Sequence, residues 1–301
     1  MTTSTPKPRE PWHGVMVATA LPLRADLTPD YDAYAAHCRR LVEHGCDGVV
    51  PNGSLGEYQT LTPEERARVV ETAVEAVGGD RVMPGVAAYG SAEALRWARQ
   101  AADVGCRAVM LLPPNAYRAD PEAVMEHYAE VASAGLPVVA YNNPIDTKVD
   151  LTPPLLARLH AAGLIVGVKE FTGDVRRAYE IAELAPGLDL LVGSDDVVLE
   201  LGIAGAVGWI AGFANALPEA SVALYRASVA RALDTALPLY RTLHPLLRWD
   251  AKPEFVQAIK LAMDLVGRYG GPCRPPRRAL NPEQDAAVRA ATEKALAEGL
   301  R

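Results

Sequence analysis

The chain has 301 residues, 50% of them hydrophobic, and a formal net charge of −7 at pH 7. Nucleic-acid binding requires a basic patch, and prolines interrupt the densest basic stretch, residues 274–278, so we expect no nucleic-acid partner. No apolar run reaches the ~18 residues of a membrane span, so we expect no membrane partner.

The first segment, residues 1–12, lacks the apolar core of a secretory signal. After it, short apolar runs alternate with stretches of helical periodicity. Several runs are rich in Val, Ile or Leu without polar alternation, which is typical of strands buried on both faces of a parallel sheet. The expected strands span residues 14–20, 48–51, 82–85, 108–112, 138–141, 165–169, 190–193 and 208–211.

Helices are expected between these strands. Thr62 is followed by a proline and, three residues on, by Glu65, a combination that predicts a capped helix start. Asp120 before a proline predicts another. The expected helices span residues 31–44, 64–77, 92–104, 122–133 and 175–184.

Eight strands alternating with helices predict a (β/α)8 barrel. A doubly wound sheet is the alternative, but no GxGxxG motif follows the first strand, which removes the main support for a dinucleotide-binding version. After residue 211 only helices are expected. We expect the barrel over residues 12–230 and a helical extension packed on it over residues 231–301, with helices at 219–233, 237–246, 254–266 and from about Pro282.

The four cysteines form no CxxC pair and no zinc-type cluster, and the six histidines show no metal-ligand spacing. We therefore expect the first three cysteines to be buried free thiols, and we expect a cytoplasmic location and no metal site. The cysteines are Cys38, Cys46, Cys106 and Cys273.

Lys169 is the first candidate for a functional role. It ends the expected strand 165–169, and strand ends on that side of a barrel face the active site. Burial lowers the pKa of a lysine, and a neutral amine can attack a ketone to form an iminium that assists the breaking of a neighbouring bond. The alternative is a lysine that pairs with Glu170 or reaches solvent.

Tyr141 and the loop around Ser54 are further candidates. A tyrosine at a strand end can pass protons between substrate and solvent, although a buried tyrosine bonded to a backbone carbonyl is the alternative. Gly53 and its neighbours can turn backbone N–H groups and the Ser54 hydroxyl toward an anion such as a carboxylate, or form an ordinary turn. Glu57 would brace this loop by accepting backbone N–H groups.

In its ordered motifs the chain resembles the dihydrodipicolinate synthase / N-acetylneuraminate lyase family. The resemblance extends from about residue 12 to 280 and implies a barrel-shaped lyase that forms a Schiff base with a 2-oxo acid. It also implies a homotetramer without metal or organic cofactor. The matching motifs are GSLGEYQTLTPEER (residues 53–66), YNNP (141–144), GVKEFTGD (167–174), GSDD (193–196) and AGAVGWIAGFAN (204–215).

The resemblance implies a role for each matching position. Lys169 falls on the Schiff-base lysine and Tyr141 on the tyrosine that relays protons. Ser54 and the backbone of Leu55, after Gly53, fall on the loop that holds the substrate carboxylate. The remaining positions are Ile210, whose carbonyl would contact the imine, Asn115 in the substrate site, and Gly193 as support for the loop after its strand.

Three residues depart from the synthases of this family. Leu55 stands where they have a second threonine, Asn115 where they have a tyrosine, and Asp146 where they have an arginine for the carboxylate of the aldehyde substrate. An aspartate there would repel that carboxylate. The strings PNGSLGEYQT and YNNPIDTKVD are more similar to a catabolic branch, so a deaminase of hydroxylated pyrroline-carboxylate is the leading interpretation.

Other functions stay open at this stage. Within the family these are 4-hydroxy-tetrahydrodipicolinate synthase and sugar-acid dehydratases or aldolases, which share the same first steps. Outside catalysis, the departures leave room for a sensor that binds a small acid without turning it over. An unrelated barrel that uses a metal or a phosphate is a third possibility, although no ligand cluster supports it.

Overall fold

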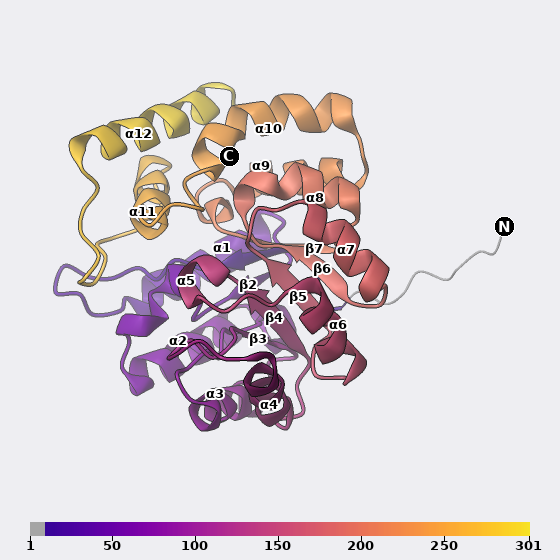
Figure 1. Cartoon of the computed structure of the whole chain (residues 1–301). Helices are drawn as coiled ribbons and strands as arrows, with labels where there is room; N and C mark the ends of the chain where they lie inside the picture. Colours follow the sequence, from indigo (N-terminus) through magenta and orange to yellow (C-terminus); the bar gives the residue numbers. More distant parts are fainter. Residues whose placement is uncertain (1–9) are drawn as a thin grey trace.

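The computed structural model describes residues 10–301 (Figure 1). Residues 1–9, most of the segment in which no secretory signal was expected, lie outside the described residues. Within residues 10–301 the strands form one parallel sheet in the order β2-β1-β7-β6-β5-β4-β3. They are β1 (Gly14–Ala18), β2 (Gly48–Val50), β3 (Val109–Leu111), β4 (Val138–Asn142), β5 (Gly167–Glu170), β6 (Asp189–Val192) and β7 (Gly208–Ala211).

The gap between the sheet edges β2 and β3 is closed by residues 82–86. On one side the Gly85 N–H donates to the Pro51 carbonyl at 2.8 Å, and on the other the Val86 N–H donates to the Met110 carbonyl at 2.9 Å. This segment takes the eighth position of the barrel, so the expected (β/α)8 fold is confirmed.

The expectation of a full third strand over residues 82–85 is wrong, because the segment makes only isolated bridges to its neighbours. Pro84 has no N–H to donate. Gly85 passes so close to β2 that a Cβ there would lie 2.4 Å from the Asn52 carbonyl oxygen.

Helices surround the sheet on its outer side (Figure 1). The predicted capping box is confirmed: Thr62 Oγ1 accepts the Glu65 N–H at 3.2 Å, and Glu65 Oε2 accepts the Thr62 N–H at 3.0 Å. None of the helices in residues 10–301 combines the length and apolar character needed to cross a membrane. Up to the last strand they are α1 (Tyr31–Glu43), α2 (Pro63–Val77), α3 (Ser91–Asp103), α4 (Pro121–Ala132), α5 (Pro144–Thr147), α6 (Pro153–Ala161), α7 (Arg176–Leu184) and α8 (Val198–Ala204).

After β7 the chain contains only helices, as expected: α9 (Pro218–Val229), α10 (Leu233–Leu247), α11 (Phe255–Leu265) and α12 (Pro282–Ala297). The single helix expected over residues 219–233 is wrong, because α9 ends at Val229 and Arg231 adopts a left-handed φ of 56°. Figure 1 shows α10, α11 and α12 together at one end of the barrel. A division into two domains at residue 231 stays a prediction.

The C-terminal segment is fixed to the barrel by a buried ion pair. Lys260 on α11 donates to Glu57 Oε1, in the loop after β2, at 2.8 Å, and the two side chains are 2% and 1% exposed. Lys260 also donates to the Pro272 carbonyl, and the Arg274 backbone N–H donates to Glu57 Oε2. Because every charged atom has a partner, this pair can lie in the interior at an acceptable cost.

We expect Glu57→Gln to lower the free energy of unfolding by about 3 to 5 kcal/mol, because it leaves the Lys260 ammonium buried without a counter-charge. Denaturant unfolding followed by circular dichroism measures the change. Asp285→Asn, in an exposed pair on α12, is the matched control and should have a much smaller effect. Equal losses for the two variants would contradict the prediction.

Candidate active site

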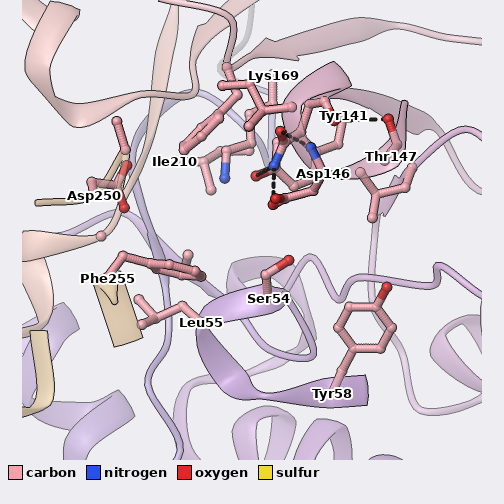
Figure 2. A pocket seen from close by; sticks show the side chains of 18 of the residues that line it. Ser54, Leu55, Tyr58, Tyr141, Asp146, Thr147, Lys169, Ile210, Asp250 and Phe255 are labelled. Carbon is pink, nitrogen blue, oxygen red and sulfur yellow. Dashed lines mark hydrogen bonds between the residues drawn. The ribbon is translucent and has the colours of Figure 1, made fainter. Parts of the chain in front are cut away.

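A cavity of about 350 Å³ opens at the carboxyl ends of the strands, where a barrel enzyme places its active site. We call it the central cavity (Figure 2). Glu57 and Gly193 are not among its lining residues, although both had been expected to support the site. The lining residues that the sequence predicted are Gly53, Ser54, Leu55, Asn115, Tyr141, Lys169 and Ile210.

Lys169 and Tyr141 lie side by side on neighbouring strands. They are register partners between β5 and β4, and the Lys169 Nζ lies 4.2 Å from the centre of the Tyr141 ring. The Lys169 side chain is 5% exposed. The alternative in which Lys169 pairs with Glu170 does not apply, because that carboxylate accepts from the Thr172 N–H and the Asn142 amide instead.

The surroundings of Lys169 favour a neutral amine. Burial lowers the pKa of Lys169 to about 8, against the opposing pull of the Asp250 and Asp195 carboxylates. With a pKa of about 8 the ammonium form still predominates at pH 7, but the unprotonated fraction is far larger than for an ordinary lysine, and only that form is a nucleophile.

Two buried aspartates stand near this amine. The Asp195 carboxylate accepts the Trp209 indole N–H at 2.9 Å and the backbone N–H groups of Gly212 and Phe213, so it joins the end of β6 to the end of β7. Asp250 Oδ2 accepts the Asp195 N–H at 3.2 Å. Burial raises the pKa of Asp195 to about 6 and that of Asp250 well above its usual range.

Asp250 could not be identified as a site residue from the sequence. It lies in the loop between α10 and α11, 81 positions after Lys169 (250 − 169), where no motif or spacing marks it. Asp195 lies in the GSDD motif, which was noted only as part of the family resemblance. Its role as the acceptor of N–H groups from β7 depends on the pairing of β6 with β7, which the sequence pattern does not contain.

The Tyr141 hydroxyl accepts a hydrogen bond from the Asn143 side-chain amide at 3.3 Å. The same amide donates to Asp146 Oδ2 at 2.9 Å, and Asp146 lines the mouth of the central cavity. Burial raises the pKa of Tyr141, so its hydroxyl keeps its proton at neutral pH. The Tyr141 hydroxyl is therefore a polar group at the cavity wall and is not tied to a backbone carbonyl.

The loop after β2 forms a tight turn at the cavity. Ser54–Gly56 is one turn of 3-10 helix, bracketed by Asn52 and Glu57 in left-handed conformations. Figure 2 shows the Ser54 side chain directed into the cavity, across from Lys169 and Tyr141. This arrangement leaves the Ser54 hydroxyl available to a ligand.

The two predicted support residues act from outside the cavity. Glu57 accepts the backbone N–H of Arg274 and the Lys260 ammonium, so it joins the turn to the C-terminal helices and not to its own loop. At Gly193 a Cβ would lie 2.4 Å from the Glu170 carbonyl oxygen, so glycine permits the close approach of β6 to β5.

Other lining residues were not singled out from the sequence. Phe255 at the start of α11 and the loop residue Lys252 contribute to the wall, and Arg277 stacks on the Phe255 ring with 5.1 Å between the guanidinium carbon and the ring centre. Among residues 10–301, no group of three or more His, Cys, Asp or Glu side chains is arranged to hold a metal ion.

Comparison with known proteins identifies the family. Residues 11–295 match the model of the dihydrodipicolinate synthetase family. A 4-hydroxy-tetrahydrodipicolinate synthase of Methanosphaerula palustris is 34% identical over 92% of this chain and 97% of its own length, and a DapA-like lyase of Halobacterium salinarum is 34% identical over 92% of each chain. The crystal structure of dihydrodipicolinate synthase from Aquifex aeolicus superposes with a TM-score of 0.89 at 27% identity, covering 95% of this chain and 98% of that one. The chain therefore belongs to the dihydrodipicolinate synthetase family and is a lyase of that family.

Proposed function

We propose that this lyase binds a 2-oxo acid, or a cyclic imine derived from one, as a Schiff base on Lys169. The observation that carries the proposal is the burial of the Lys169 amine at the wall of the central cavity, beside the Tyr141 ring. The iminium formed there would withdraw electrons from the neighbouring carbon and so assist elimination or carbon–carbon cleavage. The proposed reaction uses no metal and no organic cofactor.

The other lining residues have supporting roles in the proposal. The Tyr141 hydroxyl relays protons between substrate and solvent. The Ser54 hydroxyl and the N–H groups of its turn, after Gly53, bind the substrate carboxylate. The Ile210 carbonyl contacts the imine region, and Asn115 contacts the rest of the substrate. The assembly is proposed to be a homo-oligomer, a tetramer by the family resemblance.

For the substrate, we propose a hydroxylated pyrroline-carboxylate that is deaminated. Asp146 at the cavity mouth would repel the carboxylate of a second, aldehyde substrate, and Leu55 and Asn115 lack the hydroxyls of the synthases' proton relay. In the proposed reaction the Schiff base becomes an enamine, the ring hydroxyl leaves as water and the nitrogen leaves as ammonia. Hydrolysis then frees a dioxo acid, with net uptake of a water molecule.

A 4-hydroxy-tetrahydrodipicolinate synthase is the second candidate. Relatives at 34% identity carry that name. Arg277 favours it as well, because this half-buried cation lies at the cavity mouth, where a second carboxylate can approach it. Sugar-acid dehydratases and aldolases share the first steps, and a small-acid sensor remains the candidate without turnover.

Borohydride reduction in the presence of pyruvate should add the mass of the reduced pyruvate unit to Lys169, because reduction makes a Schiff base permanent. Intact mass and peptide mapping measure this adduct. Lys169→Ala should abolish the adduct, whereas Lys294→Ala, at an exposed position on α12, should leave it unchanged. If pyruvate, other 2-oxo acids and cyclic imines all leave the wild-type mass unchanged, the proposed function is wrong.

The rate of adduct formation should increase with pH through about 8, the pKa of Lys169, because only the neutral amine attacks. Asp250→Asn removes a carboxylate that stabilises the ammonium form, so the pKa should fall and the midpoint should move to lower pH. Quenching with borohydride at a series of pH values gives both curves. If the midpoint of the rate against pH in Asp250→Asn equals or exceeds that of the wild type, Asp250 does not stabilise the ammonium form of Lys169.

The purified protein should release ammonia from 4-hydroxy-pyrroline-2-carboxylate, and it should not condense pyruvate with aspartate semialdehyde. A coupled ammonia assay and a condensation assay, run on the same preparation, separate the two candidates. Condensation without ammonia release would favour the synthase. Adduct formation without turnover of either substrate would favour the sensor.

A further inference from the structure

Asp250 is a carboxyl group of the C-terminal segment that reaches the wall of the central cavity. Its side chain is 7% exposed, and Figure 2 shows it beside Ile210, on the side away from Asp146 and Thr147. Burying a carboxyl group is unfavourable unless its oxygens have hydrogen-bond partners. The partners of the two Asp250 oxygens therefore indicate whether one of them can bind a ligand.

The two oxygens of Asp250 differ. Oδ2 accepts the Asp195 backbone N–H, whereas Oδ1 accepts no hydrogen bond from any of the residues 10–301. Oδ1 lies against Gly212, where a Cβ would come within 2.6 Å of it. The absence of a side chain at Gly212 therefore leaves the space that Oδ1 occupies, and this oxygen is left available to a ligand in the cavity.

The other carboxylates near the cavity do not have the same capacity. Asp195 uses its oxygens on the Trp209 indole and on two backbone N–H groups, so it holds structure together and orients Asp250. Asp146 accepts the Asn143 amide at the exposed mouth. Asp250 is thus the buried carboxyl of the cavity wall that has an oxygen available to accept a hydrogen bond from a ligand.

In this arrangement Lys169 can act as the nucleophile and Asp250 as the group that carries protons. Both groups line the central cavity, and burial disfavours the charged form of each, so it favours the state with a neutral amine on Lys169 and the proton on Asp250. With the proton on the carboxyl, Lys169 is ready to attack and Asp250 is ready to donate. A ketone substrate loses its oxygen as water and a cyclic imine loses its nitrogen as an amine, and both leaving groups must gain protons. The two differ in that the released amine takes up a further proton and becomes a cation, whereas water leaves neutral.

We propose that Asp250 binds the ring nitrogen of a cyclic imine and carries protons to it while Lys169 takes the place of that nitrogen. The inference rests on the proposed function and specifies its substrate as a nitrogen-bearing ring. The bond from Lys169 Nζ to the imine carbon forms, and the bond from that carbon to the ring nitrogen breaks. Two protons pass from Nζ through the Asp250 carboxyl to the nitrogen, which becomes an amine.

This exchange balances without water, oxidant or reductant, because one imine replaces another. The released amine remains attached to the substrate chain and takes up a proton near neutral pH. The Asp250 carboxylate then serves as its counter-ion beside Gly212, while the enamine chemistry proceeds at the Schiff base. Asp250 therefore favours a leaving nitrogen, which ends as a cation, over a leaving oxygen, which departs as neutral water.

The test compares two probes that have the same carbon chain, 1-pyrroline-2-carboxylate and 2-oxopentanoate. Adduct formation is followed by borohydride quenching and intact mass, on the alkaline plateau of each variant so that the titration of Lys169 does not contribute. For Asp250→Asn, whose amide oxygen can still accept the Asp195 N–H, the rate with the imine should fall about 100-fold more than the rate with the ketone. Asp285→Asn, in the exposed pair on α12 and outside the cavity lining, is the matched control and should change neither rate.

Gly212→Ala gives an independent variant that keeps the carboxyl but crowds Oδ1, and it should show the same selective loss with the imine. The role of Asp250 would be overturned if variants with the wild-type unfolding temperature lost adduct-formation rate equally with both probes. It would also be overturned if they lost none with the imine. If the wild type forms no adduct with either probe or with pyruvate and the other 2-oxo acids and cyclic imines, the proposed function itself is wrong, so the two failures are distinguishable.

Discussion

The structure is organised around one buried amine. Lys169 lies at the end of a buried strand. A lysine there needs either carboxylates that stabilise its ammonium form or a lowered pKa that lets it lose its proton. The molecule provides both conditions, since burial lowers the pKa of the amine while Asp195 and Asp250 oppose that fall. Parallel pairing of β4 with β5 then puts the Tyr141 ring against the same nitrogen.

The C-terminal helices complete the site that the barrel begins. Asp250 enters the cavity from the loop between α10 and α11, and Phe255 adds an apolar wall. The buried pair of Lys260 and Glu57 holds α11 against the turn that carries Ser54, so the position of the Ser54 turn depends on both parts of the chain. Displacing α11 would therefore disturb the cavity as well as the packing.

Family membership and substrate choice rest on different residues. The family model matches residues 11–295, a range that contains the strands, the turn at Ser54 and the Lys169–Tyr141 pair. Leu55 and Asn115, which the proposed function takes as departures from the synthases, line the same cavity and carry no hydroxyl groups. A shared first step on the lysine, followed by different leaving groups, is compatible with both observations.

The sequence by itself determined the local features: the alternation of strands and helices, the cap at Thr62 and the strand end that carries Lys169. These follow from backbone preferences and from periodic burial, which short stretches of sequence encode. Only the tertiary structure decided that residues 82–86 close the barrel despite Pro84, and that Glu57 meets a lysine 203 positions away. It also brought Asp250 to the cavity, because contacts between distant segments depend on how the barrel closes and how the helices pack, and no local pattern records either.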